Sequence, residues 1–482
     1  MPATKSFILL LFGTISFCMS PAQRKYAPDV EPCACPIKVD SNFKAFCAYL
    51  IVPENRKKQN DKKIKLPFVV VRSNNAVKRA DPVLFTGGGP GNSSLAWASG
   101  VTKGDLISNR DCIAFEQRGT RFAIPYLRSF ELDTAIKEAY RKNLNKDSMV
   151  IVGLKRYKKA LEARGIDLAG YNTDETVADI HDLIKVLKLD SVNLMSGSYG
   201  GGLMMAVLQK DPSKIRSLVL DSPLPTFIPI DEQEPANLIE ALNHLFENSR
   251  RDSADRQLYG NLKTEFHNYF TSIANRKFYF PYLEKASKDS LQVAYTKNEL
   301  LDVIDNTMQD ASRIKDVPYM IAQMIRGHHE VYIRERLDNI FLKNQAPDGM
   351  RISVYCADQA NYHDLKTLNQ LYDVYPYLRG YHVNDVYKQM CDCWNVPPID
   401  KKTKMPFYSN KPALLGDGAM DPACRPLYVD LIHHYLPNSQ RFLFLKRSHG
   451  AFGWDEGRKI VKKFLDDPLQ KIESMHPEIV AY

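Results

Sequence analysis

Between residues 43 and 220, short apolar segments alternate with amphipathic ones, and this alternation limits the possible folds more than any other feature of the chain. The apolar segments have the length and β-branched content of buried strands. They are Leu66–Val71, Val83–Phe85, Ile113–Phe115, Val192–Met195 and Leu218–Leu220. Helices are predicted from Thr173, as the N-terminal cap, to about Lys188, and over Leu203–Gln209. The sequence therefore predicts an α/β fold whose mainly parallel sheet has helices on both faces.

The pattern changes after Pro223. Residues 226–405 are predicted to form helices with long polar faces, such as Asn237–Asn248, Leu258–Ile273 and Lys297–Met308. Strand-like segments return at Ala413–Leu415 and Arg441–Lys446, and a last helix is expected near Gly457–Leu465. We therefore expect a core formed by residues 23–225 and 406–482, interrupted by a helical cap at 226–405. Such a cap usually covers the end of the sheet where ligands bind.

Composition and charge exclude several classes of protein. The chain has 482 residues, of which 44% are apolar and 25% charged, which excludes a disordered, collagen-like or coiled-coil protein. The net charge is +9, and the basic residues cluster only between Arg56 and Lys65. Aromatic or glycine residues do not interleave this cluster, so we expect a solvated loop and no nucleic-acid partner.

The N-terminus has the pattern of a secretory signal peptide. Lys5 precedes an apolar run from Phe7 to Phe17, and small residues follow at Ser20 and Ala22. We expect residues 1–22 to be removed and the mature chain to begin at Gln23. The run is too short to span a bilayer, and the rest of the sequence has no span of 18 apolar residues. The protein is therefore expected to be exported, to the periplasm or the extracellular space, without a membrane span.

Removal of the signal peptide leaves an even number of cysteines. They are Cys33, Cys35, Cys47, Cys112, Cys356, Cys391, Cys393 and Cys424. An even number in an exported protein favours disulfides, although eight cysteines allow 105 pairings. Two pairs have C-x-C spacing and no histidines at ligand spacing, so zinc is disfavoured.

The turn at residues 196–202 carries the strongest chemical signal. It reads Ser-Gly-Ser-Tyr-Gly-Gly-Gly and joins a predicted strand directly to a predicted helix. A nucleophilic serine on such a turn needs small residues two positions before and after it. Ser196 and Gly200 meet this requirement around Ser198, although the first position is usually glycine. A glycine-rich turn without chemistry is the alternative.

A serine nucleophile also needs a histidine base and an acid to orient it. In α/β folds with this turn, acid and histidine follow the serine, each on a loop after a strand. Asp421 follows the strand at 413–415, and His449 follows the strand at 441–446. Asp417, nearer the strand end, is the competing acid.

The developing oxyanion needs backbone N–H donors. One is expected at Tyr199 and the other in the loop Gly87–Gly91, which follows the strand at 83–85. Gly88 is the preferred donor and Gly89 the alternative. A phosphate-binding loop is disfavoured because the GK[ST] ending is missing.

Together these segments resemble the proline iminopeptidase and tripeptidyl aminopeptidase family, serine exopeptidases of the α/β-hydrolase fold. Cys47–Asn55 is similar to the family's first strand, Gly87–Gly91 to its H-G-G-P-G loop, and Glu116–Arg121 to its D-Q-R-G-x-G segment. The Ser198 turn and the segment from Leu414 to Pro426 with His449 complete the resemblance. Glu116 and Arg121 depart from the family's aspartate and glycine.

The resemblance implies a serine peptidase that releases amino acids or short peptides from free N-termini, with no metal and no organic cofactor. It also implies acidic residues that hold the substrate's ammonium group. Glu232 or Glu234 is a candidate for that role, and the alternative is solvated carboxylates at a helix start. Arg118 is expected to pair with a carboxylate beneath the active-site loop. An esterase or lipase with the same triad is the alternative function, and a non-catalytic binding protein is a third.

Overall fold

The computed structural model describes residues 28–58, 62–343, 346–362 and 365–482. The predicted signal peptide lies outside these residues. The described chain forms a ten-stranded sheet with the order β1-β2-β3-β5-β4-β6-β7-β10-β11-β12. The strands are β1 (Asp29–Pro32), β2 (Ala45–Pro53), β3 (Lys63–Val71), β4 (Val83–Phe85), β5 (Cys112–Phe115), β6 (Val192–Ser198), β7 (Ile215–Pro223), β10 (Ala413–Gly418), β11 (Ser439–Phe444) and β12 (Ile479–Ala481).

The six central strands, from β5 to β11, are parallel to one another, and the strands outside them pair antiparallel. Every strand predicted from the sequence is present in this sheet. Since β7 pairs with β10, the chain between them leaves the sheet after one central strand and returns at the next. The carboxyl ends of the parallel strands all lie at one edge, which is where ligands bind in open α/β sheets.

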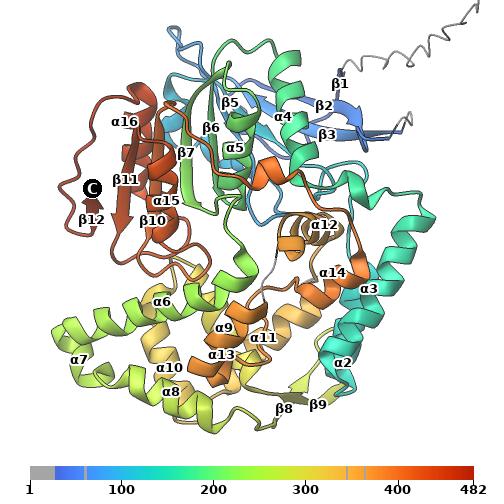
Figure 1. Ribbon diagram of the computed structural model, residues 1–482, viewed down its shortest axis with the longest axis vertical. Helices are drawn as coiled ribbons and strands as arrows, with labels where there is room; N and C mark the ends of the chain where they lie inside the picture. The colour runs from blue at the N-terminus through green and yellow to red at the C-terminus, as the bar shows by residue number, and fades with distance from the viewer. Residues whose placement is uncertain (1–27, 59–61, 344–345, 363–364) are drawn as a thin grey trace, which may run out of the picture.

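Helices cover both faces of the sheet, as the alternating pattern predicts (Figure 1). One face packs against α4 (Thr173–Val186), α5 (Tyr199–Lys210) and α15 (Leu427–Tyr435). The other packs against α1 (Ala96–Val101) and α16 (Asp455–Asp466). Neighbouring residues of one strand face opposite sides, so Leu84 belongs to the first apolar core and Val83 to the second.

The segment between β7 and β10 is mainly helical. Its helices are α6 (Ile230–Arg251), α7 (Ser253–Tyr259), α8 (Leu262–Ser272), α9 (Lys297–Gln309), α10 (Val317–Ile325), α11 (Glu330–Leu342), α12 (Gly349–Asp358), α13 (Leu365–Val374) and α14 (Lys388–Trp394). Side chains of α6, α8, α9, α10 and α11 form a separate apolar core, which includes Phe266, Leu301 and Ile321. Among the described residues, none of the helices combines the length and apolar content needed to cross a bilayer.

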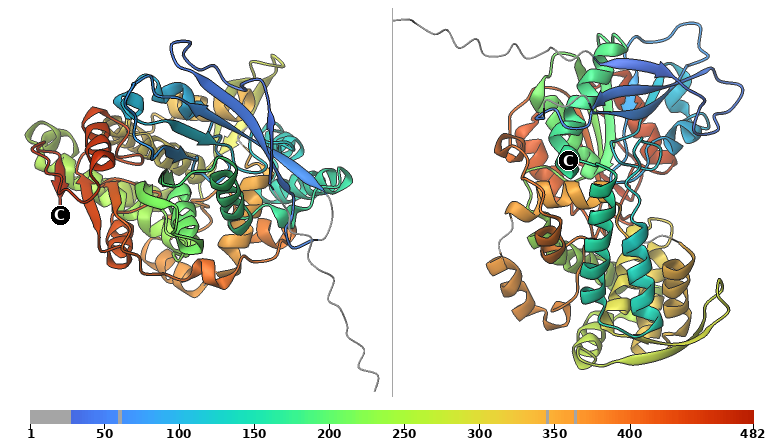
Figure 2. Two further views of the ribbon diagram at one scale, coloured as in Figure 1. Left: turned by 90° about the horizontal axis from the view of Figure 1, so that it is seen from above. Right: turned by 90° about the vertical axis from the view of Figure 1, so that its right-hand side faces the viewer.

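Helices α2 (Phe130–Arg141) and α3 (Lys146–Ala163) precede the inserted segment in sequence but lie beside it (Figure 2). The ring of Tyr157 on α3 packs 5.5 Å from the ring of Trp394 on α14. Helix α2 contacts strand β9 (Ser290–Tyr295), and Tyr140 belongs to the apolar core of the inserted helices. The helical layer over the sheet edge is thus built from two stretches of the chain.

Three local expectations differ from the structure. The N-terminal cap of α4 is Asn172, whose side chain accepts from the N–H of Glu175 at 3.0 Å, so Thr173 is the first helical residue. The helix expected over 258–273 is divided between α7 and α8 around Gly260, a residue that weakens helices. The inserted segment also contains a hairpin, β8 (Phe278–Leu283) and β9 (Ser290–Tyr295), where only helices were expected.

Disulfides, expected from the even cysteine count, are present as two pairs. Cys35 is bonded to Cys47, and Cys356 to Cys391. Each C-x-C motif therefore has one bonded cysteine and one free cysteine. The first bond ties the N-terminal segment to β2, and the second joins α12 to α14 within the inserted segment.

Candidate active site

Ser198 is the last residue of β6, and α5 begins at the next residue. Its backbone has φ 56° and ψ −134°, a conformation that residues other than glycine rarely adopt and that costs of order 1–3 kcal/mol. A Cβ atom on Gly200 would lie 1.9 Å from the Ser196 hydroxyl, so the turn requires a residue without a side chain there. This is the strained strand-to-helix turn that the sequence predicts, and it raises Ser198 above the edge of the sheet.

Ser196 occupies the position where the usual pattern has glycine. Its hydroxyl donates to the carbonyl oxygen of Thr86 at 2.7 Å, and the side chain is buried. This bond links the end of β6 to the end of β4. The serine in place of glycine therefore adds a hydrogen bond between the Ser198 turn and the end of the strand that leads into the glycine loop.

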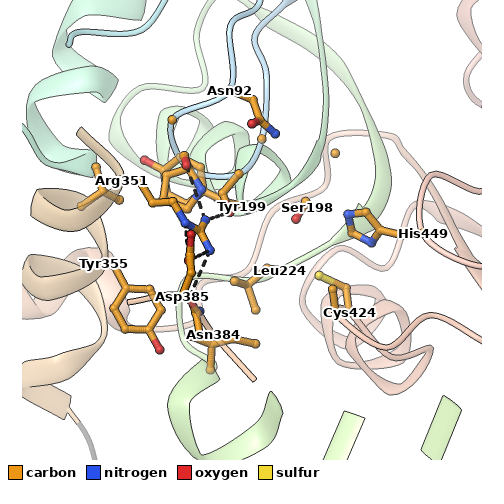
Figure 3. A pocket seen from close by; sticks show the side chains of 18 of the residues that line it. Asn92, Ser198, Tyr199, Leu224, Arg351, Tyr355, Asn384, Asp385, Cys424 and His449 are labelled. Atoms are coloured by element: carbon orange, nitrogen blue, oxygen red, sulfur yellow. Dashed lines mark hydrogen bonds and ion pairs between the residues drawn. The ribbon is translucent and has the colours of Figure 1, made fainter. Parts of the chain in front are cut away.

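The structure brings Asp421 and His449 into direct contact. One carboxylate oxygen of Asp421 lies 2.7 Å from Nδ1 of His449. The other oxygen accepts from the backbone N–H groups of Ala423 and Cys424, at 2.8 and 2.9 Å. His449 and Ser198 line the same pocket (Figure 3). With both oxygens occupied, the Asp421 carboxylate fixes the orientation of the imidazole.

Asp417, the competing acid, has a different environment. It is buried behind Asp421, and one of its oxygens accepts from the N–H of Gly418 at 2.8 Å. Burial, followed by the nearby charge of Asp421, raises the pKa of Asp417 well above its usual value. The surroundings of Asp417 therefore favour its protonated form, whereas Asp421 makes the contact with the histidine.

The surroundings of His449 favour its protonated form. Burial lowers the pKa of the imidazole, but the carboxylate of Asp421, with Asp221 and Asp305, outweighs it, so the net shift is upward. Burial also raises the pKa of Asp221 to about 6 and that of Asp305 to about 7. A base surrounded by acids in this way needs a higher pH than an ordinary histidine to become neutral.

The glycine loop lies directly against the serine. A Cβ atom on Gly88 would be 2.6 Å from the carbonyl oxygen of Gly197 and 3.1 Å from Cβ of Ser198. Only a glycine fits at this distance, which places the predicted donor beside the nucleophile. The N–H of Tyr199, at the first position of α5, is the other predicted donor.

Residues of the segment 116–121 hold the glycine loop in place. The Gln117 amide donates to the carbonyl of Gly87 at 2.6 Å. One oxygen of Glu116 accepts from the N–H of Ser94 at 2.8 Å, and the other accepts from the hydroxyl of Thr120, also at 2.8 Å. Glu116, which departs from the family's aspartate, thus joins the two loops.

Arg118 pairs with a buried carboxylate, as expected. Its guanidinium makes two bonds of 2.8 Å to the two oxygens of Asp179 on α4 and donates to the carbonyl of Glu54 at 2.7 Å. The arginine is fully buried, so these contacts satisfy a charge that would otherwise be costly.

The pocket in front of Ser198 has a volume of about 750 Å³ and is lined by the sheet edge and by the inserted segment. Glu234, a predicted ammonium ligand, lines this pocket and accepts from the Asn384 amide at 2.9 Å. Glu232, the other candidate, has its side chain outside the described residues. Of the two, the structure thus describes only Glu234 at the pocket.

Five residues that line this pocket were not predicted from the sequence as site residues. They are Asp358, Arg351, Asn384, Asp385 and Cys424. The Arg351 guanidinium lies in the pocket wall, bonded to the glycine loop and to the loop before α14 (Figure 3). Burial raises the pKa of the free Cys424 thiol well above its usual value, so this thiol next to Ser198 is uncharged. None of these five residues has a local motif from which its role could be predicted.

A six-stranded parallel centre, helices on both faces and a serine turn after a central strand define the α/β-hydrolase fold. Residues 81–262 match the model of the α/β-hydrolase fold family, which is less than half of the chain. The fold predicted from the sequence is thus confirmed, and it is a fold of hydrolases.

Three solved structures illustrate the range of similar proteins. The proline iminopeptidase of Mycobacterium smegmatis is 14% identical, with a TM-score of 0.41, over 87% of this chain and 97% of its own. A serine hydrolase from Cycloclasticus zankles is 12% identical, with a TM-score of 0.38, over 87% and 98%. An esterase from Exiguobacterium antarcticum is 15% identical, with a TM-score of 0.35, over 85% and 97%. No curated protein matches the sequence.

Proposed function

We propose that this protein is an exported serine aminopeptidase that releases amino acids or short peptides from free N-termini. The observation that carries the proposal is a single pocket lined by Ser198, by His449, which is hydrogen-bonded to Asp421, and by the carboxylate of Glu234. The first three residues supply acyl-transfer chemistry, and a carboxylate in the same pocket is complementary to an ammonium group. This combination favours peptides with a free amino end over neutral substrates.

In the proposed reaction, Ser198 Oγ attacks the scissile carbonyl while His449 takes its proton. The C=O carbon becomes tetrahedral, and the N–H groups of Tyr199 and Gly88 stabilise its oxyanion. His449 then gives its proton to the leaving amine, which departs and leaves an acyl-enzyme on Ser198. Water attacks this ester with His449 as base, and the acid is released with Ser198 restored.

Asp421 acts throughout by orientation and charge. Its bond to Nδ1 keeps Nε2 of His449 free to exchange a proton with Ser198. Its negative charge stabilises the imidazolium that forms when the serine proton is taken. The two backbone N–H donors on its other oxygen hold the carboxylate in place against the imidazole.

Glu234 is the proposed ligand for the substrate's ammonium group. It lies on α6, in the same pocket as Ser198, and Asn384 holds one of its oxygens. An ion pair inside a pocket is screened less by water and salt than one on the surface. We therefore assign Glu234, of the two candidates, to recognition of the amino end.

A carboxylesterase with the same triad is the second candidate. Leu224, Val354 and Val383 give the pocket an apolar wall that an acyl chain would fit. An esterase would not need a carboxylate within reach of the acyl group, so Glu234 separates the two possibilities.

A matched substrate panel tests the proposal. It contains fluorogenic peptides of one to three residues with a free amine, the same peptides N-acetylated, and a short-chain ester, with Ser198→Ala as the background control. We expect cleavage of the free-amine peptides and little or none of the acetylated ones. Ester cleavage without peptide cleavage would retain the triad and replace the aminopeptidase with an esterase.

The proposed export is supported by the two disulfides, since such bonds persist in oxidising compartments. The apolar run from Phe7 to Phe17 supplies the signal. Mass spectrometry of the protein recovered from the periplasm or medium of the producing cells should find Gln23 at its N-terminus. Recovery of the full-length chain from the cytoplasm would contradict export.

A further inference from the structure

Arg351 occupies a position that no motif predicted. It lies in α12, on the inserted segment, and its side chain extends across the pocket wall to the glycine loop beside Ser198. Nη1 donates to the carbonyl of Gly89 at 2.7 Å and approaches that of Pro90 at 3.5 Å. The backbones are also close, because a Cβ atom on Gly91 would lie 3.1 Å from Cβ of Arg351.

The same guanidinium binds the loop that precedes α14. Nε donates to Asp385 at 2.7 Å, and Nη2 donates to the side-chain oxygen of Asn384 at 3.0 Å. The Asn384 amide nitrogen then donates to Glu234 at 2.9 Å. A continuous set of hydrogen bonds thus runs from Gly89 through Arg351 and Asn384 to Glu234, and Figure 3 shows Arg351 at its centre.

The bond to Arg351 also determines which way the Asn384 amide points. Its oxygen accepts from Arg351 and from the N–H of Val386 at 3.1 Å, so its nitrogen is the group left to face Glu234. If the guanidinium were absent, the amide would lose one of the donors that fix this orientation. Arg351 therefore acts on Glu234 through the side chain of Asn384, in addition to the direct attraction between their charges.

We propose that Arg351 is a positioning residue with two targets: the glycine loop that stabilises the oxyanion, and, through Asn384, the carboxylate that receives the substrate's amino end. The second target rests on the proposed function, whereas the first holds for any substrate of this serine. A planar guanidinium with several donors can hold both at once, which a lysine ammonium on a single stem cannot. One residue of the inserted segment would thus align substrate recognition with catalysis.

The two targets predict different kinetic effects. Loss of the bond to Gly89 should lower kcat for every substrate, the ester included, because the oxyanion donor is displaced. We expect Arg351→Met to lower kcat for the ester about 10-fold, less than the 10²–10³-fold loss for removing a donor outright. Loss of the bond to Asn384 should in addition raise KM about 10-fold, but only for free-amine peptides.

Two further variants separate the targets. Asn384→Ala should raise KM for free-amine peptides and leave kcat for the ester within about 2-fold, since it leaves the loop contact intact. Compared with Arg351→Met, Arg351→Lys should bring kcat for the ester closer to the wild-type value than it brings KM for the peptide. The reason is that one ammonium group can reach Gly89 without holding Asn384. Arg313→Met, at an exposed arginine paired with Glu335, is the matched control and should change neither.

The experiment measures kcat and KM for the ester and for one free-amine peptide. The concentration of active sites used to calculate kcat is determined by titration with an organophosphonate that reacts with the serine. Titration removes any loss due to misfolded protein. An unchanged ester kcat in Arg351→Met would overturn the first target, and an unchanged peptide KM would overturn the second. If the wild type does not distinguish free from acetylated peptides, the aminopeptidase proposal fails, while the ester measurement still decides the first target.

Discussion

The two walls of the candidate catalytic pocket are built in different ways. On the sheet side, Ser198 is the last residue of β6, Asp421 lies three residues after β10, and His449 lies five residues after β11. Their positions follow from the backbone pairing of parallel strands, whose carboxyl ends lie side by side. The side chains need few contacts of their own to meet, because the sheet brings them together.

On the inserted side, Glu234, Arg351 and Asn384 come from α6, α12 and the loop before α14. They are held by hydrogen bonds between side chains rather than by a shared backbone ladder. The wall with the proposed reacting groups is therefore fixed by the fold, whereas the wall proposed to select the substrate is fixed by individual residues. Substitutions in the first wall should therefore affect turnover of all substrates, and those in the second should depend on the substrate.

The largest effect is expected for Ser198→Ala. Loss of the nucleophile should lower kcat by about 10⁵–10⁶-fold for peptide and ester alike, leaving the residual rate due to oxyanion stabilisation and binding. The melting temperature should not fall, because the substitution removes only the hydroxyl and leaves the backbone of the turn unchanged. Turnover close to wild type, measured with fluorogenic substrates, would show that another residue is the nucleophile.

The next largest effect separates Asp417, which lies in β10, from Asp421, which lies in the loop after it. Asp421→Asn should lower kcat about 10⁴-fold, since an amide cannot stabilise the imidazolium and favours the wrong tautomer of His449. Asp417→Asn should have a much smaller effect, because burial and the charge of Asp421 favour the protonated form of Asp417, and it is Asp421 that contacts the histidine. Equal losses in the two variants, measured on the ester, would contradict the assignment of Asp421.

The residues proposed for the first wall could be named from the sequence because their signals are local. Ser198, Asp421 and His449 each follow a recognisable strand, and Gly88 lies in a loop whose glycines mark a close approach. The choice between Asp421 and Asp417 needed the structure, since both acids follow the same strand. Thr173 was a plausible cap because threonine often caps helices, but Asn172 lies one residue earlier and competes for the same N–H.

The second wall could not be predicted in the same way. Arg351 is distant in sequence from the glycine loop, and it contacts this loop only because α12 packs over the sheet edge. Asn384 is joined to the site only through its bonds to Arg351 and Glu234. The arginine lies within an ordinary amphipathic helix, so its sequence context does not distinguish it from a surface arginine. The position of helices α2 and α3 beside the inserted segment could not be predicted either, because their apolar faces could pack on a sheet or on other helices equally well.

A substitution at Glu234 tests whether the second wall acts only on particular substrates. Glu234→Gln should raise KM for free-amine peptides about 10-fold or more and leave the ester unaffected, because it removes a charge that only the ammonium group uses. Glu247→Gln, on the same helix but exposed, is the matched control. An equal loss on ester and peptide would mean that Glu234 supports the pocket's structure rather than the amino end.

The pH dependence tests the acids around His449. Because the pKa of His449 is raised, the neutral base appears only above an ordinary histidine's range, so kcat/KM should rise with a midpoint above about 6.5. Asp305→Asn removes one of the acids that favour the imidazolium and should move this midpoint to lower pH. Steady-state rates on the uncharged ester from pH 5 to 9 measure both, and a midpoint unaffected by Asp305→Asn would exclude its contribution.

The smallest expected effect concerns stability and the acid behind Asp421. The pKa of Asp417 is raised in the folded protein, so its contribution to stability is complete below the unfolded pKa of about 3.9 and is lost as pH rises towards the folded value. Asp417→Asn removes this loss, because an amide does not ionise in the unfolded chain. The difference in melting temperature, variant minus wild type, should therefore be larger at pH 8 than at pH 5. Asp455→Asn, at an exposed position, should show no such trend. A constant difference for Asp417→Asn would mean that Asp417 is ionised in the fold, and Asp421 would then face a second negative charge rather than a neutral acid.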